Sequence, residues 1–455
     1  MSTGLIIRRA LCTNLRGPRS RSASCHSRYA AKELYSRSTY QISLTKTNGY
    51  NFTSICCYST QNGRQWKTID NQSFKPSKNS FTLMSYNILA QHYIDSQPSL
   101  YRNHNPDSLQ WTHRFDVLKQ EIDDISPDIL CLQEVQQSHL SEISAHFNDQ
   151  GYDTSLFKKR TGLQVDGCAI FFKKHLFDLI EFHFVDYFQP EIKILNRCNV
   201  AVIAKFALKS KPDINFVVST THLLFNPKRH DIRLAQCSVL LAELDRIARD
   251  DVNQCKTVPI ILTGDFNVKQ ESEVFRLIIG EDIVPSKVFE KMNFRFGQNR
   301  QNLLPREIGI SDHCQHIDVA ENLNRYQTAL RTSAQNANCE SRIVQQRVIS
   351  DEEIDKSDLP FDTGVIKHHL NLLPTICPTK PVVIDEKHAS TYHNKWIMVD
   401  YIFFSEANNA SSTSKLQLLE NYQLPNAFEC FSNGTIPNHQ LGSDHYSVAA
   451  RFSIE

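Results

Sequence analysis

The ten residues Val258-Pro-Ile-Ile-Leu-Thr-Gly-Asp-Phe-Asn267 carry the strongest structural signal in this chain. Their apolar first half predicts a buried strand, because short apolar runs bounded by turn residues are typical of strands inside a sheet. Gly264 allows the backbone to turn at the strand end, and Asp265 and Asn267 then project the same way. A carboxylate that can take a proton from water and an amide that can donate to a phosphate oxygen indicate a catalytic site here.

Other predicted strands end in polar residues in the same manner. Residues 81–87, 128–134 and 216–222 read as strands that finish on a polar side chain, whereas 399–404 carries a carboxylate inside an apolar run. A buried carboxylate is costly unless it is paired or bound to a cation. We therefore expect these strand ends to share one site with Asp265 and Asn267, formed by Asn87, Glu134, His222, Asp400, Asp444 and His445.

Strands alternate with helices along most of the chain. Trp111, Phe115, Leu118, Ile122 and Ile125 recur at helical spacing and predict a helix over 110–125. Further helices are expected at 138–148, 229–250 and 271–279. Further strands are expected at 152–157, 167–173, 199–208, 215–222, 258–263, 398–404 and 446–453. Strand–helix–strand units of this kind predict an α/β layered sandwich.

Charge divides the chain into two parts. Residues 1–79 hold 13 Lys and Arg against Glu33 and Asp70, which leaves 37 basic and 47 acidic residues in 80–455. An acidic body suits an enzyme that binds cations and does not suit a protein that coats a duplex. We therefore expect a basic disordered tail over 1–79 and a catalytic domain over 80–455. Within that domain the weakly periodic, polar stretch of about 305–390 predicts a flexible insertion or lid.

The N-terminal segment and the cysteines bear on the compartment. The first 60 residues are rich in Arg and Ser with Glu33 as their one acid, a composition typical of a mitochondrial transit peptide. A disordered basic tail on a cytoplasmic or nuclear protein is the alternative. The 13 cysteines are scattered without metal-ligand spacing, which favours a reducing intracellular compartment. No apolar run is long enough for a membrane span, so no membrane association is expected.

Six motifs, named at the end of this paragraph in chain order, together resemble the endonuclease/exonuclease/phosphatase superfamily of metal-dependent phosphoesterases. The resemblance covers about 81–310 and 395–455, and Asp166-Gly-Cys-Ala-Ile-Phe171 is similar to its deadenylase-like branch. Thr221-His-Leu-Leu-Phe-Asn-Pro227 and Asp231-Ile-Arg-Leu-Ala-Gln236 are similar to the Angel proteins within that branch. The six motifs are Tyr86-Asn-Ile-Leu89, Leu132-Gln-Glu134, Thr221-His222-Leu223, Gly264-Asp-Phe-Asn267, Val399-Asp-Tyr401 and Ser443-Asp-His445.

The resemblance implies a four-layered α/β/β/α sandwich of the DNase I-like type and a role for each residue. Glu134 is expected to be the main Mg²⁺ ligand, with Mn²⁺ as a substitute, and Asn87 and Asp444 complete the metal site. Asp265 activates the attacking water and Asn267 orients it or the phosphate. His445, which Asp400 holds in place, is expected to stabilise charge on the phosphoryl oxygens, and His222 is expected to contact the scissile phosphate.

The expected partner is an RNA 3′ end, with 2′,3′-cyclic phosphate hydrolysis as the first activity and 3′–5′ exoribonuclease or poly(A) deadenylase activity as the alternative. Thr161 and Lys395 stand where the deadenylases carry an acid and an aromatic residue, which argues against adenine selectivity. No leucine-rich-repeat docking module is expected, since none of the sequence resembles one. Candidate phosphate contacts or base-stacking groups are Lys158, Arg160, Phe225, Pro227, Arg229 and Trp396.

Each site residue taken alone also has a purely structural explanation. Asn87 can cap a turn, Asp265 and Asn267 can form an Asx turn, and a single His222 is more often a hydrogen-bonded core residue. A catalytically inactive RNA-binding or scaffold protein therefore stays open as a different class. Ser311-Asp-His313 repeats the motif of 443–445, but only the second copy precedes a closing strand, so we assign the site to 443–445.

Overall fold

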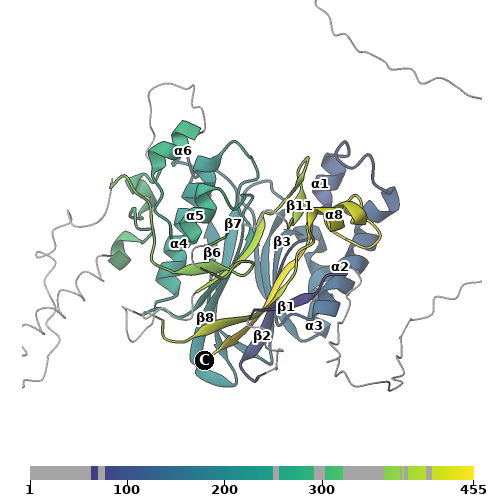
Figure 1. Cartoon of the computed structure of the whole chain (residues 1–455), viewed down its shortest axis with the longest axis horizontal. Helices are drawn as coiled ribbons and strands as arrows, with labels where there is room; N and C mark the ends of the chain where they lie inside the picture. The colour runs from purple at the N-terminus through teal and green to yellow at the C-terminus, as the bar shows by residue number, and fades with distance from the viewer. Residues whose placement is uncertain are drawn as a thin grey trace, which may run out of the picture. The chain divides into compact units, whose positions relative to one another are not determined.

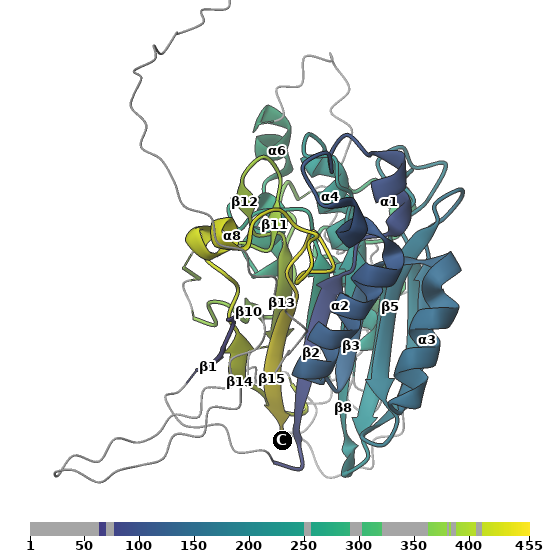
Figure 2. The same cartoon turned by 90° about the vertical axis from the view of Figure 1, so that its right-hand side faces the viewer.

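Two mixed β-sheets face each other at the centre of the protein, and helices cover their outer faces (Figures 1 and 2). The computed structural model describes residues 63–69, 77–249, 256–291, 303–320, 363–379, 382–383, 388–405 and 412–455, all within the unit Cys57–Glu455. Residues 1–62 lie outside the described residues, and with them most of the predicted basic tail and transit peptide.

The first sheet has seven strands in the described part of the chain. Its order is β1 (Trp66–Thr68), β14 (Leu416–Tyr422), β15 (Val448–Ile454), β2 (Ser80–Asn87), β3 (Ile129–Gln136), β5 (Asp166–Lys173) and β4 (Tyr152–Lys159). The strands β2 and β3 are parallel and the other neighbours are antiparallel.

The second sheet has six strands among the described residues. Its order is β10 (Leu372–Pro374), β13 (Asp400–Ser405), β9 (Ile260–Asp265), β8 (Lys211–His222), β7 (Val200–Leu208) and β6 (Phe177–Asp186). Only β8 and β9 run parallel here. A separate hairpin joins β11 (Thr391–Tyr392) to β12 (Trp396–Ile397).

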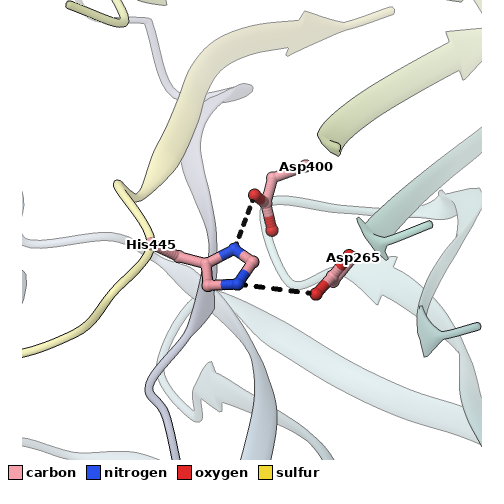
Figure 3. A group of neighbouring side chains, drawn as sticks. All are labelled: Asp265, Asp400 and His445. Carbon is pink, nitrogen blue, oxygen red and sulfur yellow. Dashed lines mark hydrogen bonds and ion pairs between the residues drawn. The ribbon is translucent and has the colours of Figure 1, made fainter. Parts of the chain in front are cut away.

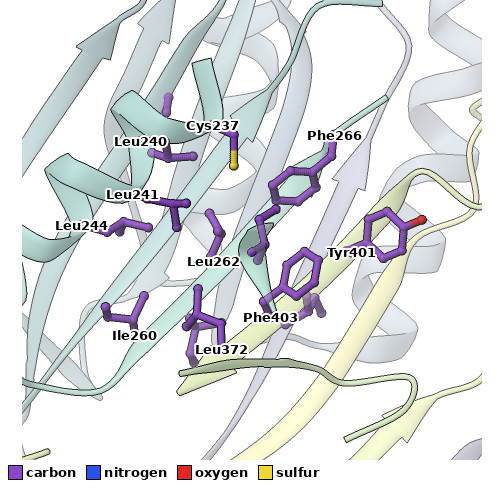
Figure 4. Packing of buried hydrophobic residues seen from close by; sticks show 14 of the residues in the cluster. Cys237, Leu240, Leu241, Leu244, Ile260, Leu262, Phe266, Leu372, Tyr401 and Phe403 are labelled. Atoms are coloured by element: carbon purple, nitrogen blue, oxygen red, sulfur yellow. The ribbon is translucent and has the colours of Figure 1, made fainter. Parts of the chain in front are cut away.

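The helices divide between the two sheets. Leu118 of α2 (Trp111–Ile125) and Phe147 of α3 (Leu140–Asp149) are buried together with Leu132 and Phe171 of the first sheet. On the second sheet, α4 (His230–Ile247) packs its Leu240 and Leu244 into the cluster that contains β9 and β13 (Figure 4). The other helices are α1 (Gln91–Ser96), α5 (Glu273–Ile278), α6 (Pro285–Lys291) and α8 (Ala427–Asn433), with short 3₁₀ turns at Pro106–Leu109, Gln137–His139 and Arg306–Ile308.

This architecture confirms the predicted four-layered sandwich. The helix expected at 110–125 is α2, and the strands expected at 167–173 and 199–208 are β5 and β7 within one residue at each end. The strands β6 and β14 were not predicted. β14 alternates between buried and more exposed side chains, and β6 mostly between partly buried and exposed ones. Neither has a long apolar run, because each faces the core on one side only.

The predicted insertion over 305–390 is wrong at both of its ends. Within this range Ile310, Ile366 and Leu373 belong to the main core, and β10 pairs with β13. These apolar residues lack a period because they pack as irregular loops and one three-residue strand. The central part, 321–362, lies outside the described residues.

The predicted start of the domain near residue 80 is also too late. Arg64 is buried and donates to the carbonyl of Ser447 at 2.6 Å and to the carbonyl of Gln423 at 2.8 Å. Its guanidinium lies 3.4 Å from Glu121 of α2 and 4.1 Å from the ring centroid of Tyr422. Residues 63–69 therefore tie β14, β15 and α2 together. A lone Arg in a basic segment offered no local signal of this.

A protein that begins at Ser80 should be less stable than one that begins at Cys57. The shorter protein loses β1 and leaves the buried carboxylate of Glu121 without Arg64, so we expect its free energy of unfolding to fall by about 3 kcal/mol. Urea unfolding of both proteins measures this, with the full chain expected to match the Cys57 protein. Equal midpoints for the Ser80 and Cys57 proteins would show that 63–69 adds nothing.

Within the described ranges, we find no helix with the length and apolar character needed to cross a bilayer.

Candidate active site

Strand register places three predicted catalytic residues in one row across the second sheet. His222 at the end of β8 is paired with Asp265 of β9, and Asp265 is paired with Asp400 of β13. Directly paired residues on one face of a sheet have neighbouring side chains. His222 Nε2 accordingly lies 3.5 Å from Asp265 Oδ2. All three side chains are buried.

Gly264 makes this close approach of β8 and β9 sterically feasible. Its φ is +141°, and a Cβ at this position would lie 2.0 Å from the carbonyl oxygen of Thr221. Any other residue would push the strands apart at the point where His222 and Asp265 meet.

The loop before β15 brings His445 between the two carboxylates (Figure 3). His445 Nδ1 lies 2.8 Å from Asp400 Oδ2, and Nε2 lies 3.8 Å from Asp265 Oδ2. The loop is held by Ser443, whose hydroxyl donates to the carbonyl of Asn87 at 2.6 Å. Both imidazole nitrogens therefore face an acid, and Asp400 sets the orientation of the ring.

Burial and charge give these groups opposite protonation tendencies. Burial alone lowers the pKa of His445, but the carboxylates of Asp400, Asp265 and Asp444 outweigh burial and hold that pKa well above its usual value. Burial, with a further effect from Asp400, raises the pKa of Asp265. Burial, assisted by the charge of Arg160, lowers the pKa of His222 well below its usual value. The site thus favours a charged His445 beside a neutral His222.

Asn87 links the two sheets at the site. Its Nδ2 donates to Glu134 Oε1 at 3.1 Å and to Asp265 Oδ2 at 3.0 Å, and its Oδ1 accepts from the Leu89 amide at 3.0 Å. Glu134 Oε2 accepts from the Ala90 amide at 2.9 Å. Since both ends of the Asn87 amide are engaged, its position is that of a bridge between two acids.

The oxygen groups around Glu134 fit a divalent cation. Asp444 Oδ1 is buried and has no hydrogen-bond partner in the described ranges, while Oδ2 accepts from Tyr101 at 3.4 Å. Burial, then the charges of Asp444 and Asp166, raise the pKa of Glu134 to about 8. Clustered carboxylates that are costly to ionise and retain a free oxygen are the hard ligands that Mg²⁺ and Mn²⁺ prefer.

Asp265, Asp400 and His445 form a second group of possible ligands, with one ligand atom of each within 4.8 Å of the others. His445 Nδ1 is already bonded to Asp400. A cation here would have to displace that contact, and we therefore regard this group as one that handles protons.

Three non-glycine residues at the site adopt left-handed backbone conformations. The φ angles are +55° at Leu89, +57° at Glu134 and +52° at Asn267. Such conformations are uncommon outside Gly, and persist where the surrounding contacts impose them. Asn267 is fixed by its Nδ2, which donates to the Leu223 carbonyl at 3.1 Å, and its backbone amide donates to Asp265 Oδ1 at 2.9 Å.

Arg114 holds the backbone of two segments that carry site residues, a role that was not predicted. It is fully buried and donates to the carbonyls of Ile88 at 3.0 Å, Leu89 at 2.8 Å and Gly442 at 2.8 Å. It thereby joins the end of β2 to the loop that carries His445. The available signal was its position in α2, where a charged residue falls on the apolar face between Trp111 and Leu118.

Arg114→Met should reduce both stability and activity. The three carbonyls lose a charged donor, so we expect the free energy of unfolding to fall by about 3–5 kcal/mol. Lys119→Met is the matched control on the same helix, since Lys119 makes a partly exposed pair with Asp116, and it should change stability by less than about 0.5 kcal/mol. Equal urea midpoints for the two variants would contradict the role given to Arg114.

Only one of the three predicted phosphate-binding cations lies at the site. Arg160 is close enough to Glu134 and His222 for its charge to act on both. Lys158 instead pairs with Asp186 at 3.4 Å, and Arg229, just before α4, pairs with Asp231 in the first turn of that helix at 2.7 Å. β4 ends at Lys159, so Arg160 leaves the strand and turns to Asp166, whereas Lys158 is still in the strand.

The residues predicted to stack on a base lie in different surroundings. Phe225 is 61% exposed, and its ring meets His393 edge to face with centroids 5.2 Å apart. Pro227 is exposed on the same loop, which Arg233 holds by donating to the carbonyls of Leu224, Asn226 and Pro227. Trp396 packs between Tyr392 and Tyr446 and supports the β11–β12 hairpin.

The repeated motif at 311–313 has a structural role. Asp312 Oδ2 accepts from the backbone amide of Thr363 at 2.7 Å and from its hydroxyl at 2.8 Å. It thus connects the two core segments on either side of 321–362, whereas the copy at 443–445 lies among the acids of the site.

A sequence profile of the Endonuclease/Exonuclease/phosphatase family matches residues 84–445, which include every residue of this site. The chain belongs to this family. It is therefore a phosphoester hydrolase, and a divalent metal requirement is typical of the family. The resemblance inferred from the six motifs is confirmed.

The relatives of this family member include the Angel proteins. Protein angel homolog 2 of Danio rerio is 34% identical over 396 residues, which are 82% of this chain and 64% of that protein. Protein angel of Drosophila melanogaster is 31% identical over 404 residues, covering 87% of this chain and 88% of that protein. The crystal structure of ANGEL2, a 2′,3′-cyclic phosphatase, matches with a TM-score of 0.66 and 28% identity, over 86% of this chain and 97% of that one. ANGEL2 has also been crystallised with adenosine-2′,3′-vanadate.

Proposed function

We propose that this protein is a divalent-metal-dependent hydrolase of RNA 3′ ends that opens 2′,3′-cyclic phosphates. The observation that carries the proposal is the convergence of His222, Asp265 and His445 on one point beside the acids Glu134 and Asp444. The similarity to ANGEL2, a 2′,3′-cyclic phosphatase, supports this substrate class.

Each site residue then has a separate role in hydrolysis. Asp265 takes a proton from water as the new O–P bond forms, and Asn267 orients the water or the phosphate. His445, charged and held by Asp400, stabilises the phosphoryl oxygens and has a proton available for the ribose oxygen that leaves. His222, neutral, contacts the phosphate from the opposite side.

The metal site is assigned to Glu134 and Asp444, with Asn87 holding Glu134 in place. A Mg²⁺ or Mn²⁺ ion bound there would neutralise charge on the non-bridging phosphate oxygens.

Two RNAs test the proposal. Purified protein, starting at Cys57, is incubated with Mg²⁺ and 5′-labelled RNA that ends either in a 2′,3′-cyclic phosphate or in an adenosine tail with a free 3′ hydroxyl. We expect opening of the cyclic end and no shortening of the tail, with Asp265→Asn as the inactive control.

The other outcomes each contradict the proposal in a distinct way. Processive shortening of the tail beside an untouched cyclic end would identify a deadenylase. Binding of both RNAs without turnover of either would identify an RNA-binding or scaffold protein. Turnover that persists after chelation of divalent ions would refute the metal requirement.

A further inference from the structure

The pair Asp166-Gly167 forms the contact between β5 and the end of β4. Asp166 is fully buried at the first position of β5, and its carbonyl accepts from the Arg160 amide at 2.9 Å. A Cβ on Gly167 would lie 2.1 Å from the carbonyl oxygen of Lys158. Only glycine therefore allows residues 158–160 to lie this close to β5, and the carboxylate one residue earlier faces the Arg160 side chain.

A three-residue network holds the Arg160 guanidinium. Tyr93 of α1 donates its hydroxyl to Asp166 Oδ1 at 2.8 Å, and Arg160 Nη1 donates to the Tyr93 hydroxyl at 2.8 Å. Arg160 Nη1 also lies 3.5 Å from Asp166 Oδ1. One face of the guanidinium is thus fixed by a buried acid and a phenol that comes from a different part of the chain.

The network leaves donor capacity unused in the site. Arg160 Nε is buried and has no hydrogen-bond partner among the residues that the structure describes, and the side chain is 16% exposed. A buried N–H of a charged group without an acceptor is costly, and a planar guanidinium matches the oxygens of a phosphate.

The position of Arg160 matches that use. Ala90, which directly precedes α1, donates its amide to Glu134 Oε2 at 2.9 Å, so α1 lies against the metal-binding acids. The charge of Arg160 reaches His222 on the other side. In both cartoon views α1 lies at the same end of the sandwich as the β11–β12 hairpin, which pairs with His445 through Thr391 (Figures 1 and 2).

We propose that Asp166 and Tyr93 are positioning residues that aim Arg160 at the phosphate of the bound RNA 3′ end. The Asp-Gly motif then increases the affinity for phosphate. Gly167 leaves room for the end of β4, and the Asp166 carboxylate orients Arg160, which directly follows β4. The inference rests on the proposed function, since it takes the substrate to be a phosphate ester in this site.

Steady-state kinetics on cyclic-phosphate RNA separate positioning from a general structural role. Asp166→Asn retains the size of the side chain and Tyr93→Phe removes one hydroxyl. In each we expect KM to rise about tenfold while kcat stays within about twofold, because Arg160 is still present but less well oriented. Arg160→Gln should raise KM further.

The double variant is the decisive measurement. If Asp166 acts through Arg160, then Asp166→Asn adds nothing to KM in the Arg160→Gln background. Asp186→Asn is the matched control, because Asp186 at the end of β6 pairs with Lys158, two residues before Arg160, and it should leave KM unchanged. Additive effects of Asp166→Asn and Arg160→Gln, or an unchanged KM in Asp166→Asn and Tyr93→Phe, would overturn the proposal.

A binding measurement keeps this result separate from the proposed function. In the Asp265→Asn background, calorimetry with adenosine 2′,3′-cyclic phosphate should give a Kd about tenfold weaker when Asp166→Asn or Tyr93→Phe is added. Should Asp166→Asn fail to fold, Tyr93→Phe carries the test. Failure of wild type to hydrolyse cyclic-phosphate RNA would refute the proposed function, whereas normal hydrolysis with an unchanged Kd in these variants would refute only the positioning role.

Discussion

Asp265→Asn should lower kcat by about a thousandfold while the protein remains folded. Asp265 is the buried acid that faces His222 and His445, and general-base catalysis by one well-placed group contributes about 10²–10⁴ in rate. Asn has the same shape but cannot take the proton. Since the substitution also removes a buried negative charge beside Asp400, we expect the free energy of unfolding to stay within about 1 kcal/mol of wild type.

Asp245→Asn is the matched control with the opposite expected pattern. Asp245 is a buried acid of α4 outside the site, where it contacts Arg249 at 2.7 Å and His369 at 2.8 Å. Burial acts to raise its pKa, but His369 and Arg249 outweigh burial and hold it below the usual value. We expect a loss of about 3 kcal/mol in stability with kcat within about twofold of wild type. Measured kcat near wild type in Asp265→Asn would remove Asp265 from the mechanism.

Glu134→Gln should abolish stabilisation by Mn²⁺ and lower activity by about a hundredfold or more. Glu134 and Asp444 supply the charged oxygens of the proposed metal site, and replacing a charged ligand with a neutral amide removes most of the attraction for a divalent ion. The measurement is the shift in melting temperature with added Mn²⁺, together with calorimetric titration of Mn²⁺. Asp400→Asn should retain Mn²⁺ binding, because Asp400 is placed with the groups that handle protons.

The same site should bind Mn²⁺ more tightly as the pH rises. The pKa of Glu134 is raised to about 8 in the folded protein, whereas its unfolded value is near 4.5, so without metal the folded form retains a proton that the unfolded chain has released. The metal-free protein therefore loses stability between about pH 4.5 and 8, and the proton competes with the cation over that range. We expect the apparent Kd for Mn²⁺ to fall at least about tenfold between pH 6.5 and 8.5.

Glu134→Gln should remove this pH dependence. A Kd for Mn²⁺ that stays constant from pH 6.5 to 8.5 in wild type would show that Glu134 is already ionised without metal. Unchanged Mn²⁺ binding in Glu134→Gln together with its loss in Asp400→Asn would move the metal to the group formed by Asp265, Asp400 and His445.

Local patterns in the chain predicted the parts of the site that lie at strand ends. Asn87, His222 and Asp265 each finish a strand, and that position could be recognised from the apolar run before them. Glu134 was recognised in the same way, although β3 continues to Gln136 and Glu134 lies at an irregularity in its pairing. The deadenylase-like motif that begins at Asp166 was also recognised, although its contact with Arg160 was not. Arg64, Tyr93 and Tyr101 were missed because each acts on a segment far away in sequence and is preceded by no distinctive local pattern. Arg114 had one local signal, its place on the apolar face of α2, but nothing local shows that it donates to the carbonyl of Gly442.

The predicted substrate contacts show most clearly what local sequence patterns cannot predict. Lys158 and Arg160 are two residues apart and equally basic, yet one pairs with Asp186 and the other lies beside Asp166. Arg229 is bound by Asp231, two residues further along the chain. Side chains two residues apart on a strand share a face, but β4 ends at Lys159. Which partner a cation takes therefore depends on where its strand ends and on the segments packed against it, and neither can be inferred from composition.

Local patterns were sufficient to predict the layered α/β architecture and the chemical types at the site, because apolar periodicity and strand-end polar residues are local properties. The family was recognised from the resemblance of the six motifs. The three-dimensional structure was needed to show that His222, Asp265 and Asp400 form one row, that His445 lies between two carboxylates, and that the domain begins before residue 69. These depend on strand register and loop packing between residues up to 383 positions apart, as in the contact of Arg64 with Ser447. The physical reason is that a side chain's partner and protonation state are set by the charges and burial that folding assembles around it.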